Sequence, residues 1–260
     1  MEKLTKQDLK SPDVFQSSAS RFTELAYKFR APFVGALSLL LLAGLGWAGY
    51  STFRDHQEGK AQEILFNAQS KLKTTEENFI KATTPQVPLK DPKTGKLLPV
   101  VQNNLVKASG NLEADYKDSL PLYKDVIQKY PSSQAAVLAS LDLGHLYSQH
   151  KKYDEASNVL QGAVKNARHP VTKGLALDQL GGSLEAKGDC SAAISQWEKV
   201  EKDKDLQFLH GSSLIKMGLC YEKLNQNDKA EQTYRRAETS TTDAEAARTA
   251  KKYLRVLKRS

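Results

Sequence analysis

Three segments of the chain share one residue pattern at a fixed interval of 37 residues. They read LGHLYSQHKKYDEASNVLQGAV from residue 143, LGGSLEAKGDCSAAISQWEKV from 180 and MGLCYEKLNQNDKAEQTYRRA from 217. In each copy an alanine follows the glycine by twelve residues, and a large apolar residue follows that alanine by four. The matched positions are Gly144, Gly181 and Gly218, then Ala156, Ala193 and Ala230, then Leu160, Trp197 and Tyr234. A period of this length predicts an array of stacked helical units.

The pattern resembles the tetratricopeptide repeat, which runs L-G-x2-Y, then A-x3-F, then a proline. The resemblance implies an all-α solenoid of helical hairpins, in which the glycine and the alanine lie where the two helices of one hairpin cross. We therefore expect Gly144 to face Ala156, and burial at this crossing would offset the cost of about 1 kcal/mol of a helical glycine. The period exceeds the family's 34 residues by three, which indicates longer turns between hairpins, with Pro170 as a helix breaker.

An incomplete unit precedes the first full copy. The segment DYKDSLPLYKDVIQKYPSS fits a second helix of the motif, with the expected aromatic, small, large and terminal proline positions at Tyr116, Ser119, Tyr123 and Pro131. The missing first helix is expected from the amphipathic stretch 57–82. Its apolar side comprises Ala61, Leu65, Ala68, Leu72 and Phe79.

A proline-rich insertion occupies residues 83–111 between these two helices. It is either a flexible excursion or a short exposed hairpin around the turn sequence DPKTG. At the other end of the array, Thr242 and Glu245 are spaced as a capping box for a helix over 243–258. That helix has an apolar stripe and a basic face, which is typical of the cap that shields the last repeat of a solenoid. The stripe consists of Ala246, Ala250, Tyr253 and Leu257.

Residues 33–53, FVGALSLLLLAGLGWAGYSTF, contain no ionisable side chain and are long enough to form a single transmembrane helix. The N-terminal tail, residues 1–32, carries six lysines and arginines, whereas only Arg54 and Lys60 follow the segment before residue 70. The positive-inside rule therefore predicts a cytoplasmic N-terminus and, in a bacterial inner membrane, a periplasmic domain over 54–260. Gly44 and Ala48 form a small-xxx-small step that would let two anchors pack into a homo-oligomer.

The net charge of +8 does not by itself indicate nucleic-acid binding, because basic and acidic residues alternate along most of the chain. The exception is RTAKKYLRVLKRS at the end, which is interpreted as a solvated basic face. The sequence contains no phosphate loop, dinucleotide fingerprint or nucleophile elbow, and His145 and His150 lack the spacing of a zinc-binding helix. We expect no catalysis, no cofactor and no metal site.

Cys190 and Cys220 are the only two cysteines. Adjacent repeats would bring them near each other, and thiols oxidise in the periplasm. Their positions among core residues nevertheless favour two buried free thiols over a disulfide.

The first helices of successive repeats are expected to line the concave wall of the solenoid. A polar strip runs along this wall and suits an extended peptide or another protein better than an apolar ligand. Its residues are His145, Ser148, Gln149, Asp178, Glu185, Lys216, Glu222 and Lys223.

A single N-terminal anchor followed by such repeats resembles the YfgM-like family of ancillary subunits of the SecYEG translocon. The resemblance includes QAAVLASLDLGHLYSQHKKYDEASNVLQGAV, which is similar to that family's first full repeat. It implies that the partners are translocon subunits, periplasmic chaperones or secreted chains. A scaffold for envelope assembly or cell division would use the same architecture and remains the alternative, since repeats alone do not name their ligand.

Overall fold

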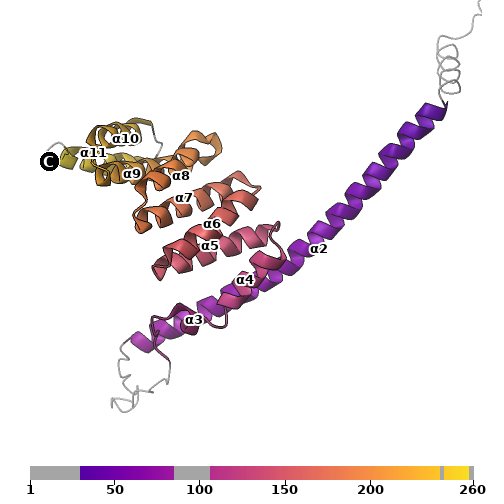
Figure 1. Ribbon diagram of the computed structural model, residues 1–260, viewed down its shortest axis with the longest axis horizontal. Coiled ribbons are helices and arrows are strands. Elements are labelled where there is room, and N and C mark those ends of the chain that lie inside the picture. Colours follow the sequence, from indigo (N-terminus) through magenta and orange to yellow (C-terminus); the bar gives the residue numbers. More distant parts are fainter. Residues whose placement is uncertain (1–29, 85–105, 241–242, 258–260) are drawn as a thin grey trace, which may run out of the picture. The chain divides into compact units, whose positions relative to one another are not determined.

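The computed structural model describes residues 30–84, 106–240 and 243–257. Every regular element in these ranges is a helix, as Figure 1 shows, which confirms the predicted all-α fold. The elements are α2 (Arg30–Thr83), α3 (Leu112–Asp115), α4 (Leu120–Lys129), α5 (Gln134–Gln149), α6 (Tyr153–Asn166), α7 (Pro170–Lys187), α8 (Cys190–Lys202), the 3-10 turn η1 (Lys204–Leu206), α9 (Gln207–Lys223), α10 (Asn227–Ser240) and α11 (Ala244–Leu257).

The chain divides into two compact units, residues 1–56 and residues 57–260, and helix α2 belongs to both. In the first unit the described large apolar side chains of α2 are exposed, including Leu45 at 70% and Trp47 at 73%. Within the described part of the chain, no helix combines the length and the apolarity that crossing a membrane requires. The predicted tail lies outside the described residues up to residue 29, and the insertion does so from 85 to 105.

In the second unit, α5 pairs with α6, α7 with α8 and α9 with α10, and each helix packs on the next along the chain (Figure 1). The turn inside each hairpin contains one residue in the left-handed conformation, and these residues recur at the 37-residue interval: Lys151 (φ 58°), Gly188 (φ 95°) and Asn225 (φ 56°). The repeat is therefore present in the backbone conformation as well as in the core. Pro170 begins α7, where its missing N–H costs no hydrogen bond.

The repeated glycines make room for the large apolar residue sixteen positions later. A Cβ atom added to Gly144 would lie 2.6 Å from Leu160 Cγ, and one added to Gly181 would lie 2.5 Å from Trp197 Cε2. Gly218 has the same relation to Tyr234. The space directly beside Gly144 is thus filled by Leu160, one helical turn after Ala156.

The repeated alanines Ala156, Ala193 and Ala230 are fully buried, each with no exposed surface. They lie one helical turn before the large residue, on the same face of the second helix. A larger side chain there would hold the two helices apart and keep the large residue from its glycine. The small residues of the repeat therefore allow the large residue to pack closely against the glycine.

The second part of α2 supplies the first helix of the incomplete unit, as predicted. Ala61, Leu65 and Ala68 are buried in one core with Tyr123 and Val126 of α4. The second helix is shorter than predicted, because α3 ends at Asp115 and α4 begins only at Leu120. Pro121, in the first turn of α4, has no N–H to continue a helix from the preceding residues.

Glu58 connects α2 to the first full repeat through two hydrogen bonds. Its Oε2 accepts a hydrogen bond of 2.7 Å from the backbone N–H of Gln134, and its Oε1 accepts one of 3.0 Å from that of Ala135. These N–H groups belong to the first turn of α5, which has no intrahelical acceptors and carries the positive end of the helix dipole. A side chain 76 residues away in the sequence thus completes the cap of α5.

Cys190 and Cys220 form a disulfide between the first residue of α8 and the last turn of α9. The interpretation of two free thiols is therefore wrong. Both cysteines are buried in the core of the last two hairpins, as expected, but α8 and α9 are consecutive helices and their Cα atoms lie 5.2 Å apart. This Cα separation suits a disulfide.

The last helix, α11, closes the array with Ala246, Ala250 and Leu254 buried. Tyr253 and Leu257, from the predicted stripe, pack half-buried against the same core, and Tyr253 stacks on Tyr234. The predicted capping residue is corrected, because Asp243 accepts from the N–H groups of Glu245 and Ala246. Thr242 lies outside the described residues. Aspartate caps at least as well as threonine and adds a charge that favours the helix N-terminus.

Candidate functional site

The eight residues of the polar strip lie on the first helices of the three repeats, α5, α7 and α9. His145, Gln149 and Lys223 are exposed, and the other five are half-buried. The structure brings these side chains together across neighbouring helices, so that most of them are paired within the chain.

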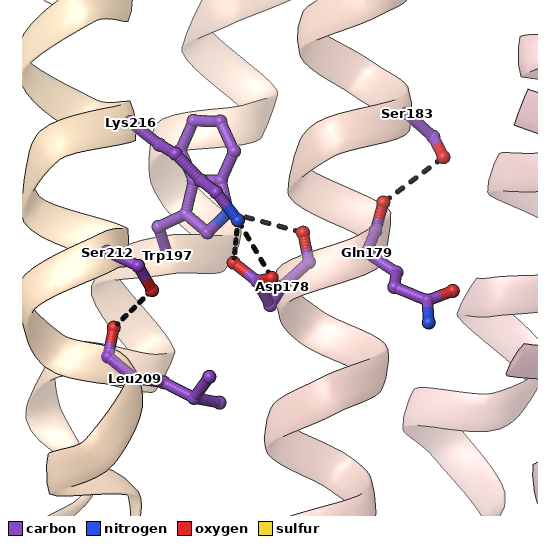
Figure 2. Close-up of polar contacts among 7 residues, drawn as sticks. All are labelled: Asp178, Gln179, Ser183, Trp197, Leu209, Ser212 and Lys216. Carbon is purple, nitrogen blue, oxygen red and sulfur yellow. Dashed lines mark hydrogen bonds and ion pairs between the residues drawn. The ribbon is translucent and has the colours of Figure 1, made fainter. Parts of the chain in front are cut away.

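Asp178 and Lys216 form the most complete of these pairs, shown in Figure 2. Lys216 Nζ lies 2.7 Å and 2.8 Å from the two carboxylate oxygens of Asp178. The indole of Trp197 lies behind the ammonium group, 5.9 Å from ring centroid to Nζ, and its Nε1 donates to the backbone oxygen of Asp178 at 3.3 Å. This cation–carboxylate pair over an aromatic ring joins the first helices of the second and third repeats.

Further pairs follow the same helices. Glu185 of α7 accepts from Lys223 Nζ of α9 at 2.8 Å, and the hydroxyl groups of Ser148 and Ser183 lie 3.0 Å apart between α5 and α7. Between α7 and α9, the charged residues of the strip are therefore paired with one another. These ion pairs and hydrogen bonds stabilise the stacking of successive hairpins, whether or not a partner binds.

Glu222 is occupied within its own hairpin. Its carboxylate accepts a hydrogen bond of 2.5 Å from the hydroxyl of Tyr234, one of the large residues of the repeat. Burial and, after it, this hydrogen bond raise the pKa of Tyr234, so the hydroxyl stays protonated and keeps donating.

A cavity of about 270 Å³ opens where the strip reaches α2. We call it the α2/α5 groove; α2, α4 and α5 enclose it, all within the unit 57–260. His145 and Gln149 are the strip residues at its edge, and they hydrogen-bond to each other at 3.0 Å. The groove is lined by Gln69, Leu72, Lys73, Glu76, Tyr123, Asp142, His145, Leu146 and Gln149.

Tyr123 lines this groove from α4, and its side chain has no exposed surface. Its buried hydroxyl interacts with the side chain of Asp142 on α5. Burial raises the pKa of Tyr123 most, and the negative charge of Asp142, the hydrogen bond with its side chain and the charge of Glu76 raise it further. Asp142 itself accepts at Oδ2 from Gln69 Nε2, 2.8 Å away. The groove thus combines two carboxylates with a buried neutral hydroxyl.

Sequence reasoning placed Tyr123 in the core and did not identify Gln69, Glu76 or Asp142 as site residues. The repeat itself contains a signal for one of them, because Asp142 lies two residues before Gly144, as Lys216 lies two before Gly218. The contribution of α2 has no such signal, since this helix precedes the repeats and carries no copy of their pattern.

Among the described residues, the remaining histidine, cysteine and acidic side chains form no second candidate site. The described residues contain no group of three or more histidine, cysteine or acidic side chains arranged to hold a metal ion. His150 is half-buried and contacts the ring of Tyr116 edge-on at a centroid distance of 5.5 Å.

Residues 28–256 match the family described as tetratricopeptide repeat-like domain. This range begins before the apolar segment and extends into α11, so it includes all three repeats and the incomplete unit. No curated protein matches the chain.

Proposed function

Because the chain belongs to the tetratricopeptide repeat-like domain family, we propose that it is a protein-binding module held at a membrane by the first part of α2. The observation that carries the proposal is the polar face formed by the first helices of the array, with the α2/α5 groove at one end. A surface of half-buried polar and charged groups matches an extended polypeptide, whose backbone amides and polar side chains need partners along their whole length.

The membrane attachment is supported by the composition and the contacts of the first part of α2. Residues 33–53 contain no aspartate, glutamate, lysine, arginine or histidine, and the described large apolar side chains among them are exposed. The hydroxyl groups of Ser38 and Thr52 donate to the backbone oxygens of Val34 and Ala48, one turn earlier, so they need no water. Tyr50 and Arg54 lie at the end of the segment, where an interfacial ring and a cation are typical.

The repeats belong, in this proposal, on the oxidising side of the membrane. The excess of lysine and arginine before the apolar segment favours a cytoplasmic N-terminus. A disulfide between consecutive repeats is stable in the bacterial periplasm and would be reduced in the cytosol. Charge distribution and disulfide therefore both support the proposal of a periplasmic repeat domain.

The resemblance to the YfgM-like family supports a role in passing secreted chains from the translocon to periplasmic chaperones. The alternative is a scaffold for envelope assembly or cell division, which would use the same anchor and strip. In both cases the chain acts by binding proteins, and we propose no enzymatic activity.

Photocrosslinking in cells tests the binding face. A photoreactive amino acid replaces Gln149, whose exposed side chain hydrogen-bonds to His145. The matched control carries the same group at Ser195, an exposed position on the second helix α8. We expect protein adducts from position 149 in clear excess over position 195.

The identity of the adducts then separates the two roles. Translocon subunits, chaperones or secreted chains support the first role, and division or assembly proteins support the second. Equal or absent adducts at the two positions would contradict the binding face itself.

A further inference from the structure

The exposed large apolar side chains of the three repeats all lie on the first helices. They are Leu138 of α5, Val171 and Leu175 of α7, and Phe208 of α9, the most exposed of them at 55%. We call these residues the apolar row. The described residues of the second helices α6, α8 and α10 include no exposed large apolar side chain. Apolar side chains that gather on one face, instead of being scattered singly, indicate a surface that binds another molecule.

One face of α7 carries both the apolar row and the polar strip. Its residues occur at alternating steps of four and three positions, which is the spacing of a single helix face. They are Val171, Leu175, Asp178, Gly182 and Glu185. The 37-residue period gives Leu138 the same place in the repeat as Leu175, and Phe208 the same place as Val171. The apolar row therefore continues the polar strip toward the N-terminal ends of the first helices.

Two ion pairs neutralise the part of the α7 face that follows the apolar row. Asp178 pairs with Lys216 of α9, as Figure 2 shows, and Glu185 pairs with Lys223 of the same helix. A charged segment bound here would compete with one of these pairs, whereas an uncharged segment leaves both intact. The face is therefore complementary to a neutral partner.

Gly182 lies between the two residues of α7 that form these ion pairs, and it leaves open space above the helix. A Cβ atom added to Gly182 would have no neighbouring atom within 4 Å, whereas one added to Gly174 of the same helix would lie 2.5 Å from Leu206 Cδ2. A glycine inside a helix costs about 1 kcal/mol relative to alanine, and no contact with a described residue offsets this cost at Gly182. The absence of a side chain allows a partner backbone to approach α7 closely.

We propose that an uncharged, extended segment of the partner protein lies lengthwise on α7. Two of its apolar side chains contact the apolar row, and its backbone passes close to Gly182 between the two ion pairs. This inference rests on the proposed protein-binding function and names the chemistry that the partner presents.

The spacing along α7 fits an extended segment. Val171 and Leu175 are four helical residues apart, about 6 Å, and two residues of an extended strand span nearly the same length. Side chains two apart in a strand point to the same side, so both can contact the row. Gly182 lies about 10 Å beyond Leu175, which corresponds to three more extended residues. The first helices α5 and α9 are neighbours of α7, and they add Leu138 and Phe208 to the contact.

Peptide binding to the full chain in lipid nanodiscs tests the inference, with empty nanodiscs as the blank. The probe is a labelled nine-residue peptide of glycine and serine with leucine at its positions 4 and 6. Matched peptides carry serine, lysine or aspartate at both positions. We expect fluorescence anisotropy to give about tenfold tighter binding of the leucine peptide than of the other three, because its apolar side chains leave water on binding. High salt should not reduce this preference, since no charge of the peptide takes part.

Two variants assign the effect to the face of the first helices. Phe208→Ser should weaken binding of the leucine peptide a few-fold, whereas Phe66→Ser, at an exposed position on α2, should not change it. Gly182→Gln fills the open space and should weaken binding about tenfold. It should not lower the unfolding midpoint, because glutamine favours a helix over glycine and its Cβ atom meets no neighbour. Gly162→Gln is the matched control, since Gly162 has the same open space inside the second helix α6.

Equal binding of the leucine and serine peptides, tighter binding of a charged peptide, or unchanged binding by either face variant would overturn the inference. If the wild-type chain binds no peptide and Phe208→Ser lowers its mass in light scattering, the face belongs to a second copy of the chain, which overturns the inference as well. If photocrosslinks from position 149 persist in any of these cases, only the apolar segment is wrong. If they are absent too, the protein-binding proposal fails with it.

Discussion

At the scale of single residues, the glycines of the repeat can be distinguished by what lies beside them. A Cβ atom on Gly181 would overlap the indole of Trp197, which is fully buried and hydrogen-bonded to Asp178, so the ring cannot move aside. The next residue, Gly182, has open space at the same atom. The sequence shows two adjacent glycines, and only the structure tells which one the fold requires.

Gly181→Ala should therefore lower the free energy of unfolding by about 1–3 kcal/mol, the usual cost of overpacking a core. Gly182→Ala should raise it by up to about 1 kcal/mol, because alanine favours the helix and meets no neighbour. Urea unfolding followed by circular dichroism measures both values. The same sign of change in the two variants would contradict the packing described for Trp197.

Lys151 occupies the left-handed turn position that is glycine in the second repeat and asparagine in the third. This conformation costs an L-residue such as lysine, which carries a Cβ atom, roughly 1 kcal/mol relative to glycine. Lys151→Gly should raise the free energy of unfolding by about that amount, whereas Lys199→Gly, inside α8, should lower it by a similar amount. Thermal unfolding of the two variants is the measurement, and destabilisation by Lys151→Gly would show that the turn is not strained.

At the scale of helices, the disulfide joins two consecutive elements that belong to different hairpins. It closes a loop of about 30 residues between α8 and α9, and crosslinks of this kind stabilise by roughly 2–4 kcal/mol. A reducing agent should thus lower the unfolding midpoint of the wild-type chain. The double variant Cys190→Ala and Cys220→Ala should unfold at a lower midpoint that the reducing agent does not change, and a wild-type midpoint insensitive to reduction would contradict the bridge.

The attachment of α2 to the repeats gives a second prediction for the helices. Glu58→Gln removes the charge that caps the first turn of α5 and leaves one amide oxygen for two N–H groups. We expect a loss of about 1 kcal/mol in the free energy of unfolding, typical of a helix cap. Glu63→Gln, an exposed change on the same helix, should have no measurable effect. Equal values for the two variants would mean that Glu58 does not hold α2 in place.

The helices that the sequence predicts well are those covered by the repeat, because glycine, alanine and the large residue recur in one register. The break between α3 and α4 was missed, since Pro121 acts locally and the pattern of Tyr116 and Tyr123 reads through it. The groove was missed for another reason. Gln69 and Asp142 are 73 residues apart, and no period connects α2 with the repeats, so their contact follows only from the packed structure.

At the scale of the whole molecule, the two parts of helix α2 differ in how far their apolar side chains are covered by the rest of the chain. The second part of α2 buries Ala61, Leu65 and Ala68 against the repeats, whereas its first part exposes a nearly unbroken apolar surface. Exposed leucines in such number are unfavourable in water and favourable in a bilayer. The proposal of a membrane anchor therefore predicts that a charged residue is tolerated at an exposed position in the second part of α2 and is not tolerated in the first part.

Leu42→Arg together with Leu45→Arg should move the chain from the membrane pellet to the supernatant after cell fractionation. Each arginine near the centre of a membrane helix costs roughly 2.5–3.5 kcal/mol, and two of them would outweigh the favourable contributions of several leucines. Phe66→Arg is the matched control, since Phe66 is also 70% exposed and lies on the same helix beyond the apolar segment. This variant should remain in the pellet. Equal partition of the two variants would contradict an anchor at residues 33–53, whereas separation of the two would assign attachment to that segment and leave the repeats free to bind proteins beside the membrane.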